Sequence, residues 1–139
     1  MLIMAPIRIL LVDDRVEFLE AVSRFLASDP EIEVVGQAVS AADALAKVDD
    51  HHPDLVLMDI ALPDMNGLEV SRRLKSKADG PRVVVLTLYD NREYRRAAQK
   101  VHVDGYVTKP ELGSQLLPLI HSIFKLPAER PTQPTRAKS

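Results

Sequence analysis

Five short aliphatic runs alternate along this chain with segments whose apolar residues recur at helical spacing. The runs cover residues 7–12, 32–35, 55–58, 83–88 and 105–107. The longer runs carry few polar side chains, which is typical of strands covered on both faces in a parallel sheet. The run at 32–35 is interrupted by glutamate. It is therefore predicted to lie at an edge of that sheet.

A helical pattern follows each run. The first predicted helix carries apolar residues at positions 18, 22, 25 and 26. The other four are predicted over 41–50, from 67 onward, over 91–101 and over 114–125. The first ends at Asp29–Pro30, because the residue before a proline is pushed out of helical geometry. Ser40 is the expected cap of the second helix. Pro118 is expected in or near the first turn of the last helix, where a missing backbone donor is tolerated.

Five strand-and-helix units in succession imply right-handed crossovers and helices on both faces of the sheet. We therefore predict an α/β fold, a three-layer, doubly wound parallel sheet of five strands. Residues 1–125 are expected to form this one domain. Residues 126–139 place three prolines among Thr, Arg, Lys and Ser with little to bury, so they are predicted to be a disordered tail or linker.

Composition narrows the function classes. The 139 residues contain no cysteine, which excludes disulfides and thiolate metal sites, and fits a cytoplasmic protein. A net charge of −2 provides no broad basic field, so we expect no direct nucleic-acid binding by this domain. No stretch is long enough to span a bilayer, and the apolar opening lacks the basic start of a signal peptide, so no membrane partner is expected.

The candidate chemistry lies where the predicted strands end. Strand one ends in Asp13 and Asp14, strand three in Asp59 and strand four in Thr87, while strand five leads to Lys109. Ligands of open parallel sheets bind outside the carboxyl ends of the strands, so neighbouring first and third strands would bring three carboxylates together. Such a cluster suits Mg²⁺, which prefers hard oxygen ligands and is usually completed by phosphate. The set therefore indicates phosphoryl transfer.

Each of these residues also has an ordinary explanation when taken alone. Asp13 and Asp14 are suitable caps for the first helix. Asp59 is a common turn residue, Thr87 a common strand residue, and Lys109 an ordinary solvated side chain. The functional interpretation depends on all five occurring in register. The histidines lack metal-ligand spacing and are interpreted as incidental.

Four motifs at suitable spacing resemble one known family. They are LLVDD at 10–14, LMDIALPDMNG at 57–67, VVLT at 84–87 and DGYVTKP at 104–110. Residues 7–125 resemble the receiver domain of two-component response regulators, and LTLYDNREY is most similar to receivers that precede a helix-turn-helix DNA-binding domain. The resemblance implies the strand order 2-1-3-4-5, one of the two common orders of doubly wound sheets.

The resemblance also implies the site. Asp59 would accept a phosphoryl group from a sensor histidine kinase or phosphotransfer protein. Mg²⁺ would be held by Asp13, Asp14, Asp59 and the backbone carbonyl of Ala61. Thr87 and Lys109 would contact phosphoryl oxygens, and the Lys109–Pro110 bond would be cis.

The resemblance further implies a switch and its partners. Thr87 and Tyr106 would shift together and change the surface of the fourth helix, fifth strand and fifth helix. The expected partners are a downstream output domain or protein and a second copy of the chain in a homodimer. The domain would be a phosphoacceptor that catalyses only its own phosphorylation and dephosphorylation.

Two other functions compete with this one. A magnesium-dependent phosphatase with an aspartyl nucleophile typically carries a second Asp two residues later, where this chain has Ala61. A pseudo-receiver that never takes up phosphate is disfavoured by the intact site residues. The chain departs from the family at His102 and Val103, which are bulkier than usual, and at Leu88, which we expect to narrow the cleft and slow self-hydrolysis.

Overall fold

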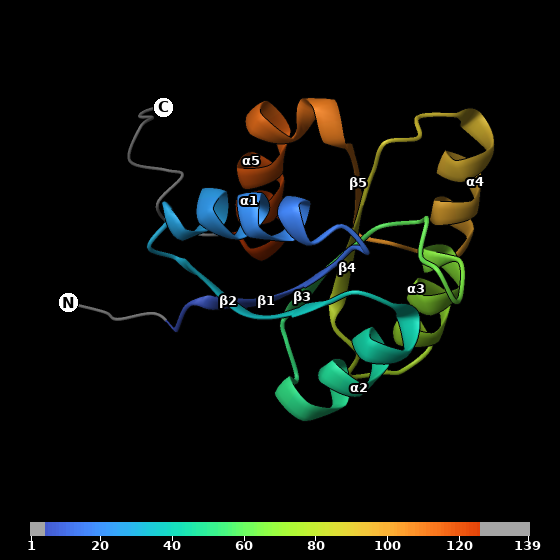
Figure 1. Ribbon diagram of the computed structural model, residues 1–139, viewed down its shortest axis with the longest axis horizontal. Helices are drawn as coiled ribbons and strands as arrows, with labels where there is room; N and C mark the ends of the chain where they lie inside the picture. The colour runs from blue at the N-terminus through green and yellow to red at the C-terminus, as the bar shows by residue number, and fades with distance from the viewer. Residues whose placement is uncertain (1–4, 126–139) are drawn as a thin grey trace.

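The computed structural model describes residues 5–125, which form one parallel sheet with helices on both faces (Figure 1). The sheet order is β2-β1-β3-β4-β5, as expected. The strands are β1 (Ile7–Val12), β2 (Ile32–Ala38), β3 (Leu55–Met58), β4 (Arg82–Thr87) and β5 (Gly105–Thr108). The helices are α1 (Val16–Ala27), α2 (Ala41–His51), α3 (Gly67–Lys75), α4 (Arg92–Lys100) and α5 (Leu112–Phe124), with a short 3₁₀ helix η1 (Lys109–Glu111) before α5.

The three layers follow from the alternation of side chains along each strand. In β1, Ile9 and Leu11 pack with residues of α1 and α5, whereas Leu10 and Val12 pack with residues of α2 and α3. Figure 1 shows α1 and α5 on one side of the sheet and α2 and α3 on the other. A strand buried on both faces needs apolar side chains at every position, which explains the nearly continuous aliphatic runs.

The winding reverses at β1 and β3, and this reversal positions the candidate site. Both strands are parallel neighbours, with Val12 in register with Met58. The next residue, Asp59, donates its backbone N–H to the carbonyl of Val12 at 3.0 Å. Asp13 and Asp59 therefore leave the sheet side by side, at the place where doubly wound folds bind ligands.

Several predicted boundaries need correction. β2 continues three residues beyond position 35, to Ala38, and lies at the sheet edge as predicted. β4 runs from Arg82 to Thr87, so Leu88 lies outside the strand. Ser40 does cap α2, because its side chain accepts a hydrogen bond from the backbone of Asp43. Residues 126–139, predicted as a tail or linker, lie outside the described residues.

The prediction for Pro118 was wrong. α5 begins at Leu112, so Pro118 is inside the helix rather than near its first turn. Proline cannot donate a hydrogen bond to the carbonyl of Ser114, four residues earlier. Both residues are exposed, and water can therefore replace the missing donor.

The cis bond implied for Lys109–Pro110 is also not found. Every peptide bond within residues 5–125 is trans, and Pro110 is part of the turn of η1. Across the same described range, no helix is long and apolar enough to cross a bilayer.

Candidate functional site

Three carboxylates meet at the carboxyl ends of β1 and β3. Asp13, Asp14 and Asp59 each have an oxygen within 4.8 Å of the others. Asp13 is 2% exposed and Asp59 is 5% exposed, whereas Asp14 is open to solvent. Carboxylates this close and this buried repel one another unless a cation balances them. The strand order therefore assembles the acidic cluster that the sequence pattern indicated.

The alternative in which these aspartates merely cap α1 does not fit the local geometry. The helix begins at Val16, and its N-cap is Arg15, whose side chain makes no capping bond. Asp13 instead accepts a hydrogen bond from the backbone N–H of Arg15 at 2.8 Å, which shapes the turn between β1 and α1. Its second oxygen is directed to Lys109.

Gly67 allows α3 to begin in close contact with the backbone of Asp59, the residue that follows β3. A Cβ atom at Gly67 would lie 1.9 Å from the backbone oxygen of Asp59, a distance that no side chain permits. The N–H of Gly67 donates to the carbonyl of Ile60 at 2.8 Å, and Asn66 caps the helix through the N–H of Leu68. The residues between Asp59 and Gly67 thus form a compact loop, whose two ends are joined by the hydrogen bond from Gly67 to Ile60.

Lys109 supplies the positive charge of the cluster. Its Nζ lies 2.5 Å from Oδ2 of Asp13 and 3.8 Å from Oδ2 of Asp59. The same nitrogen lies 4.1 Å from the ring centroid of Phe18 on α1. The Lys109 side chain is only 8% exposed, so its attraction to the carboxylates is weakly screened by solvent.

One lysine does not balance this cluster fully. Burial raises the pKa of Asp59 to about 6, against the opposing effects of Lys109 and of the backbone N–H groups of Ala61 and Ile60, while Asp13 raises it further. A carboxyl group with a raised pKa is one whose ionised form lacks sufficient stabilisation. Hard oxygen donors around a deficit of positive charge fit a divalent cation such as Mg²⁺.

A small cleft opens over the cluster. Its volume is about 200 Å³, and it is lined by Asp14, Arg15, Asp59, Ala61, Leu88, Tyr89 and Lys109. Ala61, two residues after Asp59, is exposed at this edge. Leu88 is 53% exposed, so its side chain stands at the opening and not in the core. The cleft has room for a small anionic group beside Asp59.

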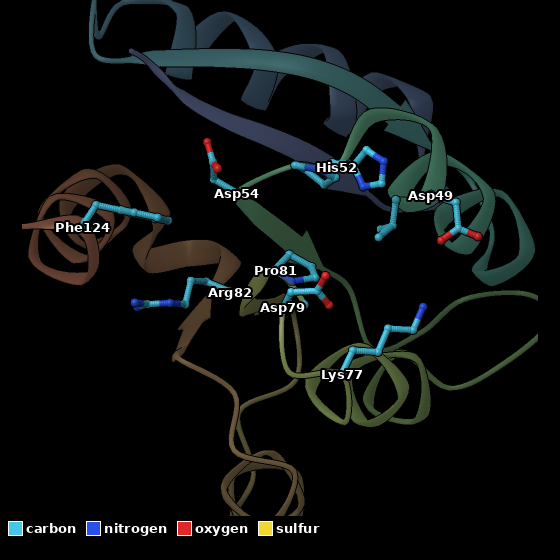
Figure 2. Close-up of a pocket in the computed structure, with 11 residues that line it drawn as sticks. Asp49, His52, Asp54, Lys77, Asp79, Pro81, Arg82 and Phe124 are labelled. Carbon is cyan, nitrogen blue, oxygen red and sulfur yellow. The ribbon is translucent and has the colours of Figure 1, made fainter. Parts of the chain in front are cut away.

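A larger hollow lies at the opposite end of the sheet and does not share this chemistry. It measures about 490 Å³ and is lined by the last turns of α2, the loops that precede β3 and β4, the first residue of β4 and the last residue of α5. Figure 2 shows its charged side chains spread around the rim, with Arg82 and Phe124 on one side and Asp49 and Lys77 on the other. These charged residues are exposed and do not converge, so size alone does not locate the site.

Thr87 and Tyr106 are connected through the backbone of Tyr89, to which both side chains are hydrogen-bonded. Thr87 is fully buried, and its Oγ1 accepts a hydrogen bond from the N–H of Tyr89 at 3.1 Å. The hydroxyl of Tyr106 donates to the carbonyl of Tyr89 at 2.7 Å. Arg95 stacks on the Tyr106 ring, 4.5 Å from its centroid, and pairs with Asp90 at 2.6 Å. Sequence reasoning missed Tyr89, because its contacts are made by the backbone and carry no residue signature.

Comparison with known families decides the class. A family model described as the response regulator receiver domain matches residues 9–121. The chain belongs to this family. Receiver domains are parts of response regulators, so the chain carries a regulatory domain of two-component signal transduction.

Curated relatives support the same assignment. The response regulator protein VraR of Staphylococcus saprophyticus is 36% identical over 121 residues, or 86% of this chain and 57% of that protein. The DNA-binding transcriptional activator DevR/DosR of Mycobacterium tuberculosis is 37% identical over 110 residues, or 79% of this chain and 51% of that protein. This receiver chain spans about half the length of the curated relatives it matches.

Solved receiver structures have the same architecture. A LuxR-family two-component response regulator from Aurantimonas sp. SI85-9A1 gives a TM-score of 0.81 at 29% identity, covering 87% of this chain and 86% of that one. A CheY-like receiver domain protein from Methanospirillum hungatei gives 0.79 at 29% identity, covering 87% and 95%.

Proposed function

We propose that this receiver domain is a phosphorylation-dependent switch in which Asp59 is the phosphoacceptor. A carboxylate oxygen of Asp59 attacks the phosphorus of a phosphohistidine on a sensor kinase or phosphotransfer protein. The phosphorus–nitrogen bond breaks, and its electron pair stays on the imidazole nitrogen. The proposal is supported chiefly by the buried position of Asp59, 3.8 Å from Lys109 and next to two further carboxylates.

The residues around Asp59 fit Mg²⁺ as a cofactor. Asp13, Asp14, Asp59 and the backbone carbonyl of Ala61 would hold the ion, which would neutralise charge on the phosphoryl group and the carboxylates. Lys109, now paired with Asp13, would pair with a phosphoryl oxygen. Positioning and charge neutralisation supply most of the catalysis in phosphoryl transfer, and these residues provide both.

Signal output would begin at Thr87. A phosphoryl group on Asp59 adds about 1.5 to 2 negative charges and strong hydrogen-bond acceptors. If the Thr87 hydroxyl turns to donate to that group, the N–H of Tyr89 loses its acceptor. The carbonyl of Tyr89 accepts the hydrogen bond of the Tyr106 hydroxyl, so the change would reach α4, β5 and α5 through the backbone of one residue.

We make a further proposal for the partners and the place of action, which the relatives support in part. One of them is named a DNA-binding transcriptional activator, and we infer that the signal passes to a DNA-binding output domain or protein. A homodimer through the changed surface and a cytoplasmic location belong to the same proposal. The phosphatase alternative is disfavoured because Ala61 stands where that class carries a general acid. The pseudo-receiver alternative is disfavoured because the acidic cluster is complete.

Intact mass spectrometry tests the acceptor. The protein is incubated with Mg²⁺ and acetyl phosphate, and a gain of one phosphoryl group is expected for the wild type and not for Asp59→Asn. Asp54→Asn is the matched control at the opposite end of the sheet and should take up the group normally. Uptake by Asp59→Asn would place the acceptor elsewhere, and no uptake by any of the proteins would favour the pseudo-receiver.

A further inference from the structure

Asp64 connects the loop after Asp59 to the start of α2. Its Oδ1 accepts a hydrogen bond from the N–H of Ala41 at 2.8 Å, and its Oδ2 accepts one from the N–H of Ala42 at 3.0 Å. Ser40 accepts the next N–H, that of Asp43, at 3.1 Å. The first three free N–H groups of α2 are thus shared between a local cap and a side chain more than twenty residues away.

This contact is the polar anchor of the loop at residues 60–66. Among the described residues, the other hydrogen bonds of this segment stay within the loop or reach only Asp59 and the start of α3. Leu62 and Met65 add apolar contacts to the core between the sheet and α2 and α3. Asp64 lies between them in the sequence and binds the backbone at the start of α2.

The contact is suited to persist at neutral pH. The backbone N–H groups of Ala41 and Ala42 lower the pKa of Asp64, so the carboxylate is ionised when both bonds form. A negative charge at a helix N-terminus also interacts favourably with the helix dipole. Two bonds from one rigid carboxylate restrain the orientation of the loop as well as its distance from α2.

We propose that Asp64 is a positioning residue that holds the loop so that the carbonyl of Ala61 faces the three carboxylates. Ala61 is three residues before Asp64 in the same short loop and is paired in a bridge with Asn66. This inference rests on the proposed function. It adds that the N-terminus of α2 supports the ion site, although α2 supplies no ligand to it.

A purely structural role would give a different pattern of effects, and Ser40 provides the matched control. Ser40→Ala removes a cap from the same helix end but leaves the loop anchored. Asp64→Ala removes a cap and releases the loop. Asp64→Asn keeps one oxygen acceptor, so its affinity for Mg²⁺ should lie between those of the wild type and Asp64→Ala.

The test measures the dissociation constant for Mg²⁺ on the full chain by isothermal titration calorimetry, with the unfolding midpoint of each variant recorded. Removing a side chain that orients a ligand group weakens metal binding by about tenfold, which we expect for Asp64→Ala. Ser40→Ala should lower the unfolding midpoint without changing the dissociation constant. Equal effects of both substitutions on Mg²⁺ affinity, or none from either, would overturn the inference.

The outcomes separate this inference from the proposed function. If the wild type binds Mg²⁺ and takes up phosphoryl groups while Asp64→Ala binds Mg²⁺ equally well, only the role of Asp64 is lost. If the wild type binds no Mg²⁺ and takes up no phosphoryl group, both the inference and the proposed function are overturned.

Discussion

The two ends of the sheet place charge in opposite ways. At the carboxyl end, the side chains of Asp13, Asp59 and Lys109 are almost completely buried, and Asp59 and Lys109 line a cleft of about 200 Å³. At the amino end, a hollow of about 490 Å³ is bordered by exposed charged residues. There Asp54 accepts a hydrogen bond from the backbone N–H of Arg8 at 2.9 Å, as an ordinary turn residue does.

The difference shows that incompletely balanced buried charge, rather than volume, distinguishes the proposed site from the other end of the sheet. Burying ionised groups without full compensation opposes folding, so such groups persist where function requires them. The exposed charges at the amino end remain hydrated and carry little cost. This contrast leads us to expect four measurable effects, of which the change in stability at Asp59 is the largest.

Replacing Asp59 should stabilise the apo protein. Its pKa is 3.8 in an unfolded chain and about 6 in the folded domain, so the folded state binds more protons between these values. Stability from this group is therefore present at low pH and lost as the pH rises through that window. Asp59→Asn should raise the free energy of unfolding by about 3 kcal/mol at pH 8 and by less than about 1 kcal/mol at pH 4.

Urea denaturation at both pH values measures this effect, and Asp54→Asn is the comparison at the amino end. That substitution should give no stabilisation at either pH, because Asp54 is exposed and hydrogen-bonded. A destabilised Asp59→Asn at pH 8 would mean that the acidic cluster contributes to the fold instead of opposing it.

Mg²⁺ affinity should follow the ionisation of Asp59. A proton competes with the metal for the carboxylate, so binding tightens as the pH rises through about 6. For one competing proton, the dissociation constant should fall about tenfold between roughly pH 5 and pH 7 and change little above that. Calorimetric titrations across this range provide the measurement, and a flat profile would contradict the coupling.

His102→Gly should stabilise the turn between α4 and β5, at the amino end of the sheet. His102 has φ 63°, in the left-handed region, and its side chain is exposed. Glycine removes a steric cost of about 1 kcal/mol there without losing buried contacts. Thermal unfolding measures the gain. Arg96→Gly, at an exposed position inside α4, should instead lose about 1 kcal/mol, and neither change should alter Mg²⁺ affinity.

Leu88→Ala should shorten the lifetime of the phosphorylated domain. The Leu88 side chain lines the cleft beside Asp59 and Lys109 and limits the approach of water. We expect hydrolysis about threefold faster, equivalent to ~0.6 kcal/mol of activation free energy. Loss of phosphoryl mass over time measures the rate. A wild-type lifetime of seconds, or an unchanged rate in the variant, would remove Leu88 from this role.

Much of the architecture was predictable because its signals are local or periodic. Buried strands need continuous aliphatic runs, an edge strand tolerates glutamate, and the alternation of strands and helices implies a parallel, doubly wound sheet. The edge position of β2 and the cap at Ser40 followed from such signals. The position of Pro118 did not, because the start of α5 depends on how η1 leads into the helix.

The order of residues along the chain was enough to show which residue types could meet: acidic residues at strand ends, a lysine before a proline, and a glycine after a short loop. The contacts themselves depend on the folded chain, in which Asp13 and Lys109 lie 2.5 Å apart, the Tyr89 backbone joins Thr87 to Tyr106, and Asp64 caps a helix that precedes it by a whole strand. The physical reason is that periodicity reports which face a side chain takes, whereas charge compensation, backbone hydrogen bonds and long-range caps depend on distances between segments remote in the chain.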